Sequence, residues 1–333
     1  MAQPGRPQAP RISFVIPVRN AAGYLPHCLS SIAANVDASG ECEILVVDNG
    51  SSDNSADIAR RFGARVIDRP DVRVGACRNA GAATSRGAIL AFVDADNEIV
   101  PGWLSACTSA FEEPNLAAAG YPYQAPSDAT WVQRMYDTFR ARTTHRRDVD
   151  WLGAGNLAVR RTAFDQIGGF DEGLETCEDV QLCHSLRGAG YRVVSEPGMM
   201  SVHHGDPQTL ADLFFGELWR GRDNLRVSLR HPITLRALPS ALMPVVTLVC
   251  GALLVLGPLA SPWLGVTVSA LGALGLLTIA ALKALVVIVR GRLTSPLQWA
   301  QGLAVAATYE AARALSLVSA ATHRTRVRVA RHA

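Results

Sequence analysis

The stretch Ala88-Ile-Leu-Ala-Phe-Val-Asp94-Ala-Asp96 decides the fold, because six apolar residues end abruptly at two carboxylates. An unbroken apolar run of this length predicts a strand buried on both faces, as in the centre of a parallel sheet. In open α/β sheets, ligands bind just beyond the carboxyl ends of such strands. Two neighbouring acids repel each other without a cation, so Asp94 and Asp96 predict a divalent metal with an anionic ligand. The alternative is that both acids only cap a turn.

Around this stretch, strand-like and helix-like segments alternate, which predicts a mostly parallel sheet with crossover helices. The expected strands are 12–16, 43–47, 65–67 and 88–93, and the expected helices are 24–35, 53–62 and 74–84. Pro17 is expected to stop the first strand. Asp48 ends its strand as Asp94 does, so both should face one crevice, where Asp48 can accept hydrogen bonds from a base or a ribose. Arg78 either reaches a phosphate or carboxylate of this site or is a solvated surface arginine.

Residues 237–282 contain no charged side chain, a run of 46 positions. A membrane-spanning helix needs about 20 apolar residues, so two spans are predicted, near 238–260 and 263–289 with Ser261-Pro262 as the turn. Arginines flank both outer ends of this pair, at positions 220, 222, 226, 230 and 236 before it and 290 and 292 after it. The positive-inside rule then places the N-terminal domain in the cytoplasm of a multi-pass membrane protein. The polar, Pro-rich segment 1–11 has no signal-peptide core.

Two further segments are predicted to lie at the membrane surface. Residues 209–229 form an amphipathic pattern. Residues 297–320 include the apolar Leu303, Val305, Leu315 and Leu317 but are interrupted by the charged Glu310 and Arg313, which predicts a surface-lying or re-entrant helix before a basic tail. The expected organisation is a flexible N-terminus (1–11), a catalytic domain (12–207), an interfacial segment (208–236), two transmembrane helices (237–290) and a final helix with its tail (291–333).

The overall composition excludes little. The net charge of +3 is concentrated near the apolar segments, so no nucleic-acid partner is expected. The seven cysteines include no CxxC pair and are expected to remain reduced in a cytoplasmic domain.

Several motifs in register resemble family 2 glycosyltransferases. They are Val15-Ile-Pro-Val-Arg-Asn20, Val46-Val-Asp-Asn-Gly-Ser-Ser-Asp53, Arg78-Asn-Ala-Gly81, Val93-Asp-Ala-Asp96, Gly155-Asn-Leu-Ala-Val-Arg-Arg161, Ile167-Gly-Gly-Phe-Asp-Glu172, Glu178-Asp179 and His203-His-Gly-Asp-Pro207. The resemblance covers about residues 12–225, and several motifs in order are far more specific than any one of them.

This resemblance implies a glycosyltransferase A-type α/β fold, a nucleotide-sugar donor and inversion at the anomeric carbon. By position, Pro17, Arg19 and Asp48 would line the nucleoside pocket, with Arg78 near it. Asp94 would contact the ribose or the metal, and Asp96 would bind Mg²⁺ or Mn²⁺. Asn97 stands where the family motif often has a further acid, and it can still coordinate through its carbonyl oxygen.

The resemblance makes Asp179 the base that takes the acceptor's proton, with Glu178 orienting the acceptor or the base. Both residues begin an apparent helix, whose dipole is expected to keep Asp179 ionised. The alternative is a pair of acids that only satisfies the dipole. His203, by its spacing to Gly205, is the expected additional metal ligand.

The sequence also bears on the acceptor. Processive members of the family carry Gln-x-x-Arg-Trp after the catalytic domain, whereas Phe215–Arg222 lacks the glutamine and reverses the Arg–Trp order. We therefore expect transfer of one sugar. The amphipathic stretch 209–229 would hold the site close to the bilayer, which suits a lipid-linked acceptor, a glycolipid or a surface glycan. The Arg/Ala bias and the family resemblance suggest a bacterial inner membrane. The basic stretch 140–147 either attracts the acceptor's phosphates or is a solvated loop.

Two other classes remain possible. One is a catalytically inactive scaffold that binds a nucleotide-sugar. The other is a nucleotidyltransferase of similar fold, although Val18–Gly23 is poor in the glycine and lysine that a triphosphate loop needs.

Overall fold

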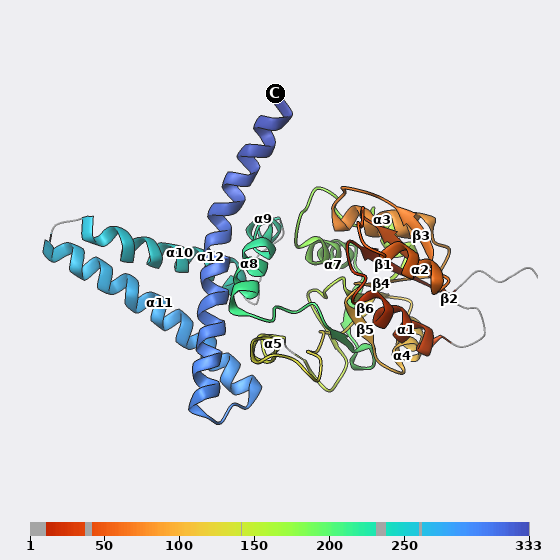
Figure 1. The fold of residues 1–333 in the computed structure, drawn as a ribbon, viewed down its shortest axis with the longest axis horizontal. Helices are drawn as coiled ribbons and strands as arrows, with labels where there is room; N and C mark the ends of the chain where they lie inside the picture. Colours follow the sequence, from red (N-terminus) through yellow and green to blue (C-terminus); the bar gives the residue numbers. More distant parts are fainter. Residues whose placement is uncertain (1–10, 37–41, 141, 231–237, 260–261, 333) are drawn as a thin grey trace, which may run out of the picture. The chain divides into compact units, whose positions relative to one another are not determined.

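The computed structural model describes residues 11–36, 42–140, 142–230, 238–259 and 262–332 (Figure 1). The strands are β1 (Ile12–Val18), β2 (Cys42–Asp48), β3 (Arg65–Asp68), β4 (Ile89–Val93), β5 (Asn97–Ile99), β6 (Leu116–Gly120), β7 (Arg147–Asp148), β8 (Asn156–Arg160), β9 (Arg192–Ser195) and β10 (Ser201–His203). The α-helices are α1 (Leu25–Asn35), α2 (Ser55–Arg61), α3 (Val74–Thr84), α4 (Trp103–Ala110), α5 (Trp131–Asp137), α6 (Arg161–Gln166), α7 (Glu178–Gly188), α8 (Leu210–Arg220), α9 (Asn224–Ser228), α10 (Leu238–Leu256), α11 (Pro262–Gly291) and α12 (Pro296–His332).

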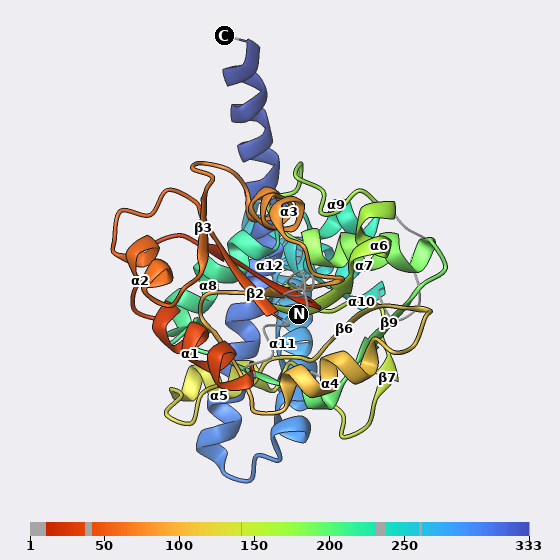
Figure 2. The same ribbon diagram turned by 90° about the vertical axis from the view of Figure 1, so that its right-hand side faces the viewer.

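Eight strands form one mixed sheet in the order β3-β2-β1-β4-β8-β6-β9-β7. Its first four strands are parallel, as predicted, whereas β8 runs antiparallel to both β4 and β6. Alternate side chains of β1 point to opposite faces, so Phe14 and Ile16 join one core cluster and Val15 joins the other. Helices α1, α2 and α4 cover the first face, and α3, α6 and α7 cover the second (Figure 2).

The strand order reverses between β1 and β4. The chain moves outward from β1 through β2 to β3 and then returns to place β4 on the other side of β1. The carboxyl ends beside such a switch point form the ligand crevice of open α/β sheets. Asp48 ends β2 and Asp94 follows β4, so both acids lie at this edge.

Pro17 lies inside β1, and the prediction that it would stop the strand is wrong. The strand continues to Val18 and pairs with β2 throughout, whereas its pairing with β4 ends at Val15. At Pro17 only one neighbour strand remains, so the missing N–H leaves the sheet intact.

A second, two-stranded sheet joins β5 to β10. Its antiparallel register places Asn97 opposite His203. The backbone N–H of His204 also donates to the carbonyl of Asp96 at 2.9 Å. This ladder brings two segments more than a hundred positions apart to the same edge as Asp94.

The chain divides into two compact units, and each is described by itself. The first contains residues up to Pro126 together with Ala141–Gly205, and the second contains Ser127–Arg140 and Asp206–Ala333. In the second unit α10 packs against α11, and α12 packs against α5, α8, α10 and α11. Two described segments, Ala241–Leu259 and Trp263–Gly291, are long and apolar enough to cross a membrane, close to the two predicted spans.

Candidate active site

Arg78 lies between two carboxylates at the crevice. Its guanidinium, from α3, contacts Asp94 Oδ1 at 2.7 Å and Glu178 Oε1 at 2.6 Å. The whole residue is only 3% exposed, so Arg78 is not a solvated surface arginine. It contacts two carboxylates at the crevice, and its part in binding a donor stays a prediction. Arg78 thereby links the end of β4 to the first turn of α7, two elements that are far apart in the sequence.

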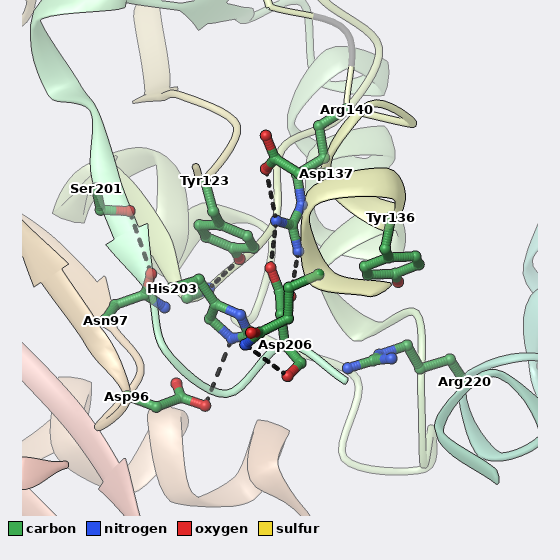
Figure 3. A network of polar contacts seen from close by, with 12 residues as sticks. Asp96, Asn97, Tyr123, Tyr136, Asp137, Arg140, Ser201, His203, Asp206 and Arg220 are labelled. Atoms are coloured by element: carbon green, nitrogen blue, oxygen red, sulfur yellow. Dashed lines mark hydrogen bonds and ion pairs between the residues drawn. The ribbon is translucent and has the colours of Figure 1, made fainter. Parts of the chain in front are cut away.

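Asp96 and His203 form a second polar pair, with Nε2 of His203 3.4 Å from Oδ2 of Asp96 (Figure 3). The β5–β10 ladder creates this pair. Two ligands in neighbouring positions of an octahedral ion lie about 3 Å apart, given bonds of about 2.1 Å, so this pair can share a divalent metal with a small adjustment. No group of three or more His, Cys, Asp or Glu ligands gathers among the described residues. A metal here would therefore take its other ligands from water and substrate phosphates, as Mg²⁺ commonly does.

Asp94 and Asn97, the residues on either side of the Ala95-Asp96 pair, bind different partners. Asp94 directs one carboxylate oxygen to Arg78, so its place in a metal shell stays a prediction. Asn97 is fully buried, and its Oδ1 accepts a hydrogen bond from Ser201 Oγ at 3.2 Å. The carbonyl oxygen of Asn97 thus already accepts one hydrogen bond within the β5–β10 sheet, and its coordination of a metal stays a prediction.

Two glycines let the backbone approach these acids closely. A Cβ at Gly205 would lie 1.8 Å from Oδ2 of Asp96, and one at Gly155 would lie 2.5 Å from Oδ2 of Asp94. Real Cβ atoms do not come this near to another atom, so any side chain at either position would displace the carboxylate.

Asp179 lies in the first turn of α7, one residue after Glu178. Its Oδ2 accepts from the N–H of Ala154 at 3.3 Å, and its Oδ1 accepts from the N–H of Val180 at 2.7 Å. Burial, and then the negative charge of Glu178, raises the pKa of Asp179 to about 7. The expectation that the helix dipole would keep Asp179 ionised is therefore wrong, because desolvation outweighs the dipole. A carboxylate with a pKa near neutrality is well matched to accepting a proton.

The predicted nucleoside side is built from the loops after β1 and β2. Asp48 is buried and its Oδ1 accepts from the N–H and the hydroxyl of Ser51, at 3.0 and 2.5 Å. Pro17 is half-buried in β1. Arg19 is exposed, and its guanidinium lies 3.7 Å from Asp71. Contact of these residues with a nucleoside stays a prediction.

Three arginines of the basic stretch 140–147 bind other protein groups. Nε of Arg142 donates to the carbonyl of Tyr123 at 2.9 Å. Arg146 pairs with Glu113 at 2.6 Å, and Arg140 pairs with Asp206. Residues 144–148, Arg146 among them, are exposed, so the solvated-loop alternative holds for this part of the stretch, whereas Arg140 and Arg142 are half-buried and bound to protein groups.

Sequence reasoning missed Tyr123, whose ring stacks on His203 with centroids 5.1 Å apart (Figure 3). It also missed the Ser201–Asn97 bond and the close approach of Gly205. Tyr123 lies in a short loop without periodicity, and its partners are distant in sequence. Gly205, which lies inside the motif His203-His-Gly-Asp-Pro207, is the local signal that could have indicated a tight contact.

Comparison with known proteins identifies the class to which this fold and site belong. The family model for glycosyl transferase family 2 matches residues 13–168. An uncharacterized glycosyltransferase of Mycobacterium tuberculosis, Rv0539, is 30% identical over 187 residues, which cover 55% of this chain and 82% of that relative. Glycosyltransferase AglE of Haloferax volcanii is 29% identical over 245 residues, covering 68% of this chain and 77% of its own length. The chain belongs to glycosyltransferase family 2.

Solved structures show the same architecture. The mannosyltransferase PcManGT from Pyrobaculum calidifontis, in complex with GDP-Man and Mn²⁺, matches with a TM-score of 0.59 at 17% identity, covering 93% of this chain and 88% of its own. GalNAc-T7 with UDP, GalNAc and Mn²⁺ matches with a TM-score of 0.50 at 16% identity, covering 68% of this chain and 52% of its own. These similarities establish the glycosyltransferase A-type fold of the first unit.

Proposed function

We propose that this protein is an inverting, metal-dependent glycosyltransferase that moves one sugar from a nucleotide-sugar to a hydroxyl of a lipid-linked or surface-glycan acceptor. The observation that carries the proposal is the arrangement at one sheet edge. The Asp96–His203 pair, the Arg78–Asp94–Glu178 cluster and Asp179 all come from the carboxyl side of the sheet or from the loops and helix beside it.

Direct displacement needs a base on one side of the sugar and a stabilised leaving group on the other. In the proposed reaction the acceptor hydroxyl gives its proton to Asp179 while its oxygen attacks the anomeric carbon. The bond from that carbon to the donor's phosphate oxygen breaks, and the nucleoside diphosphate leaves with the electron pair. Asp96 and His203 would hold a Mg²⁺ or Mn²⁺ ion, which supplies positive charge to the departing diphosphate.

The other residues would position these groups. Arg78 holds Glu178 and Asp94 in place from a buried position, and its positive charge offsets their mutual repulsion. Asp48, Pro17 and Arg19 would contact the nucleoside or its phosphates from the loops beside β1. The two named Mn²⁺ complexes among the structural neighbours support a divalent cation in this role.

Membrane attachment of the second unit is supported by what its helices expose. Over 296–318 of α12, every exposed side chain is apolar: Pro296, Leu297, Trp299, Ala300, Leu303, Ala307, Ala311, Leu315 and Val318. The ionisable residues of the same segment face other helices, since Glu310 pairs with Lys283 of α11 and Arg313 with Glu217 of α8, each at 2.8 Å. This is the reverse of a water-exposed amphipathic helix, and it suits acyl chains. We infer that the two spans and α12 contact the bilayer and that the catalytic unit is cytoplasmic.

The deciding experiment measures nucleotide release by the purified protein from a panel of nucleotide-sugars, with Mn²⁺, with Mg²⁺ and with a chelator. Asp179→Asn is the matched variant, because it keeps the shape of the side chain and removes its basicity. Metal-dependent release from one donor, lost in this variant, is the expected result. Donor binding without turnover, even with lipid-linked acceptors added, would instead favour an inactive scaffold.

A further inference from the structure

We propose that Tyr123 is a positioning residue that fixes the metal-binding pair and the loop beside the base with a single side chain. The inference rests on the proposed roles of Asp96, His203 and Asp179. It concerns a residue that follows β6 and belongs to none of the motifs noted in the sequence.

The backbone around Tyr123 is attached to the strand that carries His203. Gln124 donates its N–H to the carbonyl of Ser201 at 2.9 Å, and the N–H of His203 donates to the carbonyl of Gln124 at 2.9 Å. The carbonyl of Tyr123 itself accepts from Nε of Arg142 at 2.9 Å. These backbone bonds fix the position of Tyr123 independently of its side-chain contacts.

The ring of Tyr123 determines how the imidazole of His203 is turned. The two rings stack at an interplanar angle of 21° with centroids 5.1 Å apart (Figure 3). Lying flat against the tyrosine, the imidazole directs its edge, and Nε2 in particular, toward Asp96 at 3.4 Å. A stacked aromatic neighbour restricts rotation of the imidazole, which an aliphatic side chain would not do.

The hydroxyl of Tyr123 holds a different element, the loop 153–155. It accepts a hydrogen bond from the N–H of Gly155 at 3.0 Å. A Cβ at Gly153 would lie only 2.4 Å from the same hydroxyl oxygen, so the loop is shaped around it. The next residue in this loop, Ala154, donates its N–H to Asp179 at 3.3 Å. Gly155 also accepts, through its carbonyl, the N–H of Asp94 at 3.1 Å.

Tyr123 therefore touches His203 through its ring and the loop that supports Asp179 and Asp94 through its hydroxyl. A residue that only filled space would not combine a ring stacked on an imidazole with a hydroxyl bonded to a separate loop. The ring and the hydroxyl can be removed separately, because Tyr123→Phe keeps the stack and Tyr123→Leu loses both.

The test compares these two variants in Mn²⁺ binding, followed by the electron paramagnetic resonance signal of free Mn²⁺, and in steady-state kinetics with the donor that the panel identifies. Tyr123→Phe should bind Mn²⁺ within about twofold of wild type and lower kcat about tenfold, the effect of one lost hydrogen bond, with donor KM unchanged. Tyr123→Leu should in addition weaken Mn²⁺ binding about tenfold, as loss of groups that orient metal ligands typically does.

Tyr121→Phe is the matched control. Its hydroxyl donates to the carbonyl of Thr143 at 2.7 Å, so the control also removes one tyrosine hydroxyl bond, from a buried residue of the same segment. It should change neither Mn²⁺ binding nor kcat. Equal Mn²⁺ binding by Tyr123→Leu and wild type would overturn the role of the ring, and unchanged kcat in Tyr123→Phe would overturn the role of the hydroxyl. If wild type bound no Mn²⁺, the proposed metal site would fail instead, and the kcat of Tyr123→Phe would still judge the hydroxyl.

Discussion

At the scale of single residues, Asp179 links the protonation of one group to both rate and stability. Its pKa of about 7 means that a large fraction carries a proton at neutral pH. We expect kcat/KM to rise with pH and to level off above about 7, since only the ionised form accepts a proton. Asp179→Asn should lower kcat by about 10²–10⁴-fold, the usual contribution of a general base. A pH–rate profile of wild type and variant checks both statements.

The same pKa predicts an effect on stability. A carboxyl whose pKa rises on folding from about 4 loses stabilising influence as pH increases through the folded value. Asp179→Asn removes this cost, so its melting temperature should exceed that of wild type more at pH 8 than at pH 5. A difference that stays constant from pH 5 to pH 8 would show that Asp179 is ionised throughout this range and would contradict the raised pKa.

Gly205 gives a second residue-scale prediction. A methyl group there would collide with Asp96, whose Oδ2 would lie 1.8 Å from the new carbon. Gly205→Ala should therefore weaken Mn²⁺ binding by about tenfold or more, because Asp96, the proposed ligand, must move. Gly23→Ala is the control, since nothing lies within 4 Å of its added Cβ. Mn²⁺ titration of both variants should separate them clearly.

At the scale of elements, local sequence pattern predicted the first half of the first unit, from β1 to β4 with α1–α3, and the helix that begins at Glu178. The strands before Asp48 and Asp94 and the helices between them follow from apolar periodicity and turn residues, which act over short distances. The β5–β10 ladder did not follow, because it pairs segments that are far apart in sequence and only three residues long. The partners of Arg78 were open for the same reason. The raised pKa of Asp179 needed burial, which a helix-start pattern does not report.

The helices of the second unit support an element-scale prediction. Lys283 of α11 contacts Glu310 of α12 at 2.8 Å, and its ammonium lies 4.2 Å from the ring centroid of Tyr309. Lys283→Met leaves Glu310 buried without its cation and should destabilise the protein by about 3 kcal/mol. The double variant Lys283→Met/Glu310→Leu should recover most of that loss, because no unpaired charge remains. Titration with SDS in mixed micelles measures the cycle, and additive losses would exclude coupling between the two side chains.

At the scale of the whole molecule, the proposed topology makes opposite predictions for two exposed positions. Leu259 ends the first candidate span, and Arg292 follows the second. In intact cells, a membrane-impermeant maleimide should label Leu259→Cys and should label Arg292→Cys only after permeabilisation. Wild type, whose seven cysteines are all buried or half-buried, provides the background. The reverse labelling would place the catalytic unit outside the cytoplasm.

The path of the chain has a practical consequence for engineering. The polypeptide passes from one unit to the other after Pro126, after Arg140 and after Gly205. Within the second unit, Tyr136 of the segment Ser127–Arg140 donates its hydroxyl proton to Glu217 at 2.6 Å, and Phe139 of the same segment packs on Tyr309. A fragment ending at Gly205 would keep α5 but lose Glu217 and Tyr309. It would also expose the apolar side chains of Val132 and Met135, which are buried in the second unit. Fusing the first unit to a different membrane anchor therefore requires replacing both segments of the second unit, Ser127–Arg140 and Asp206–Ala333. A single fusion junction after Gly205 would leave α5 without its packing partners, and the product would tend to aggregate.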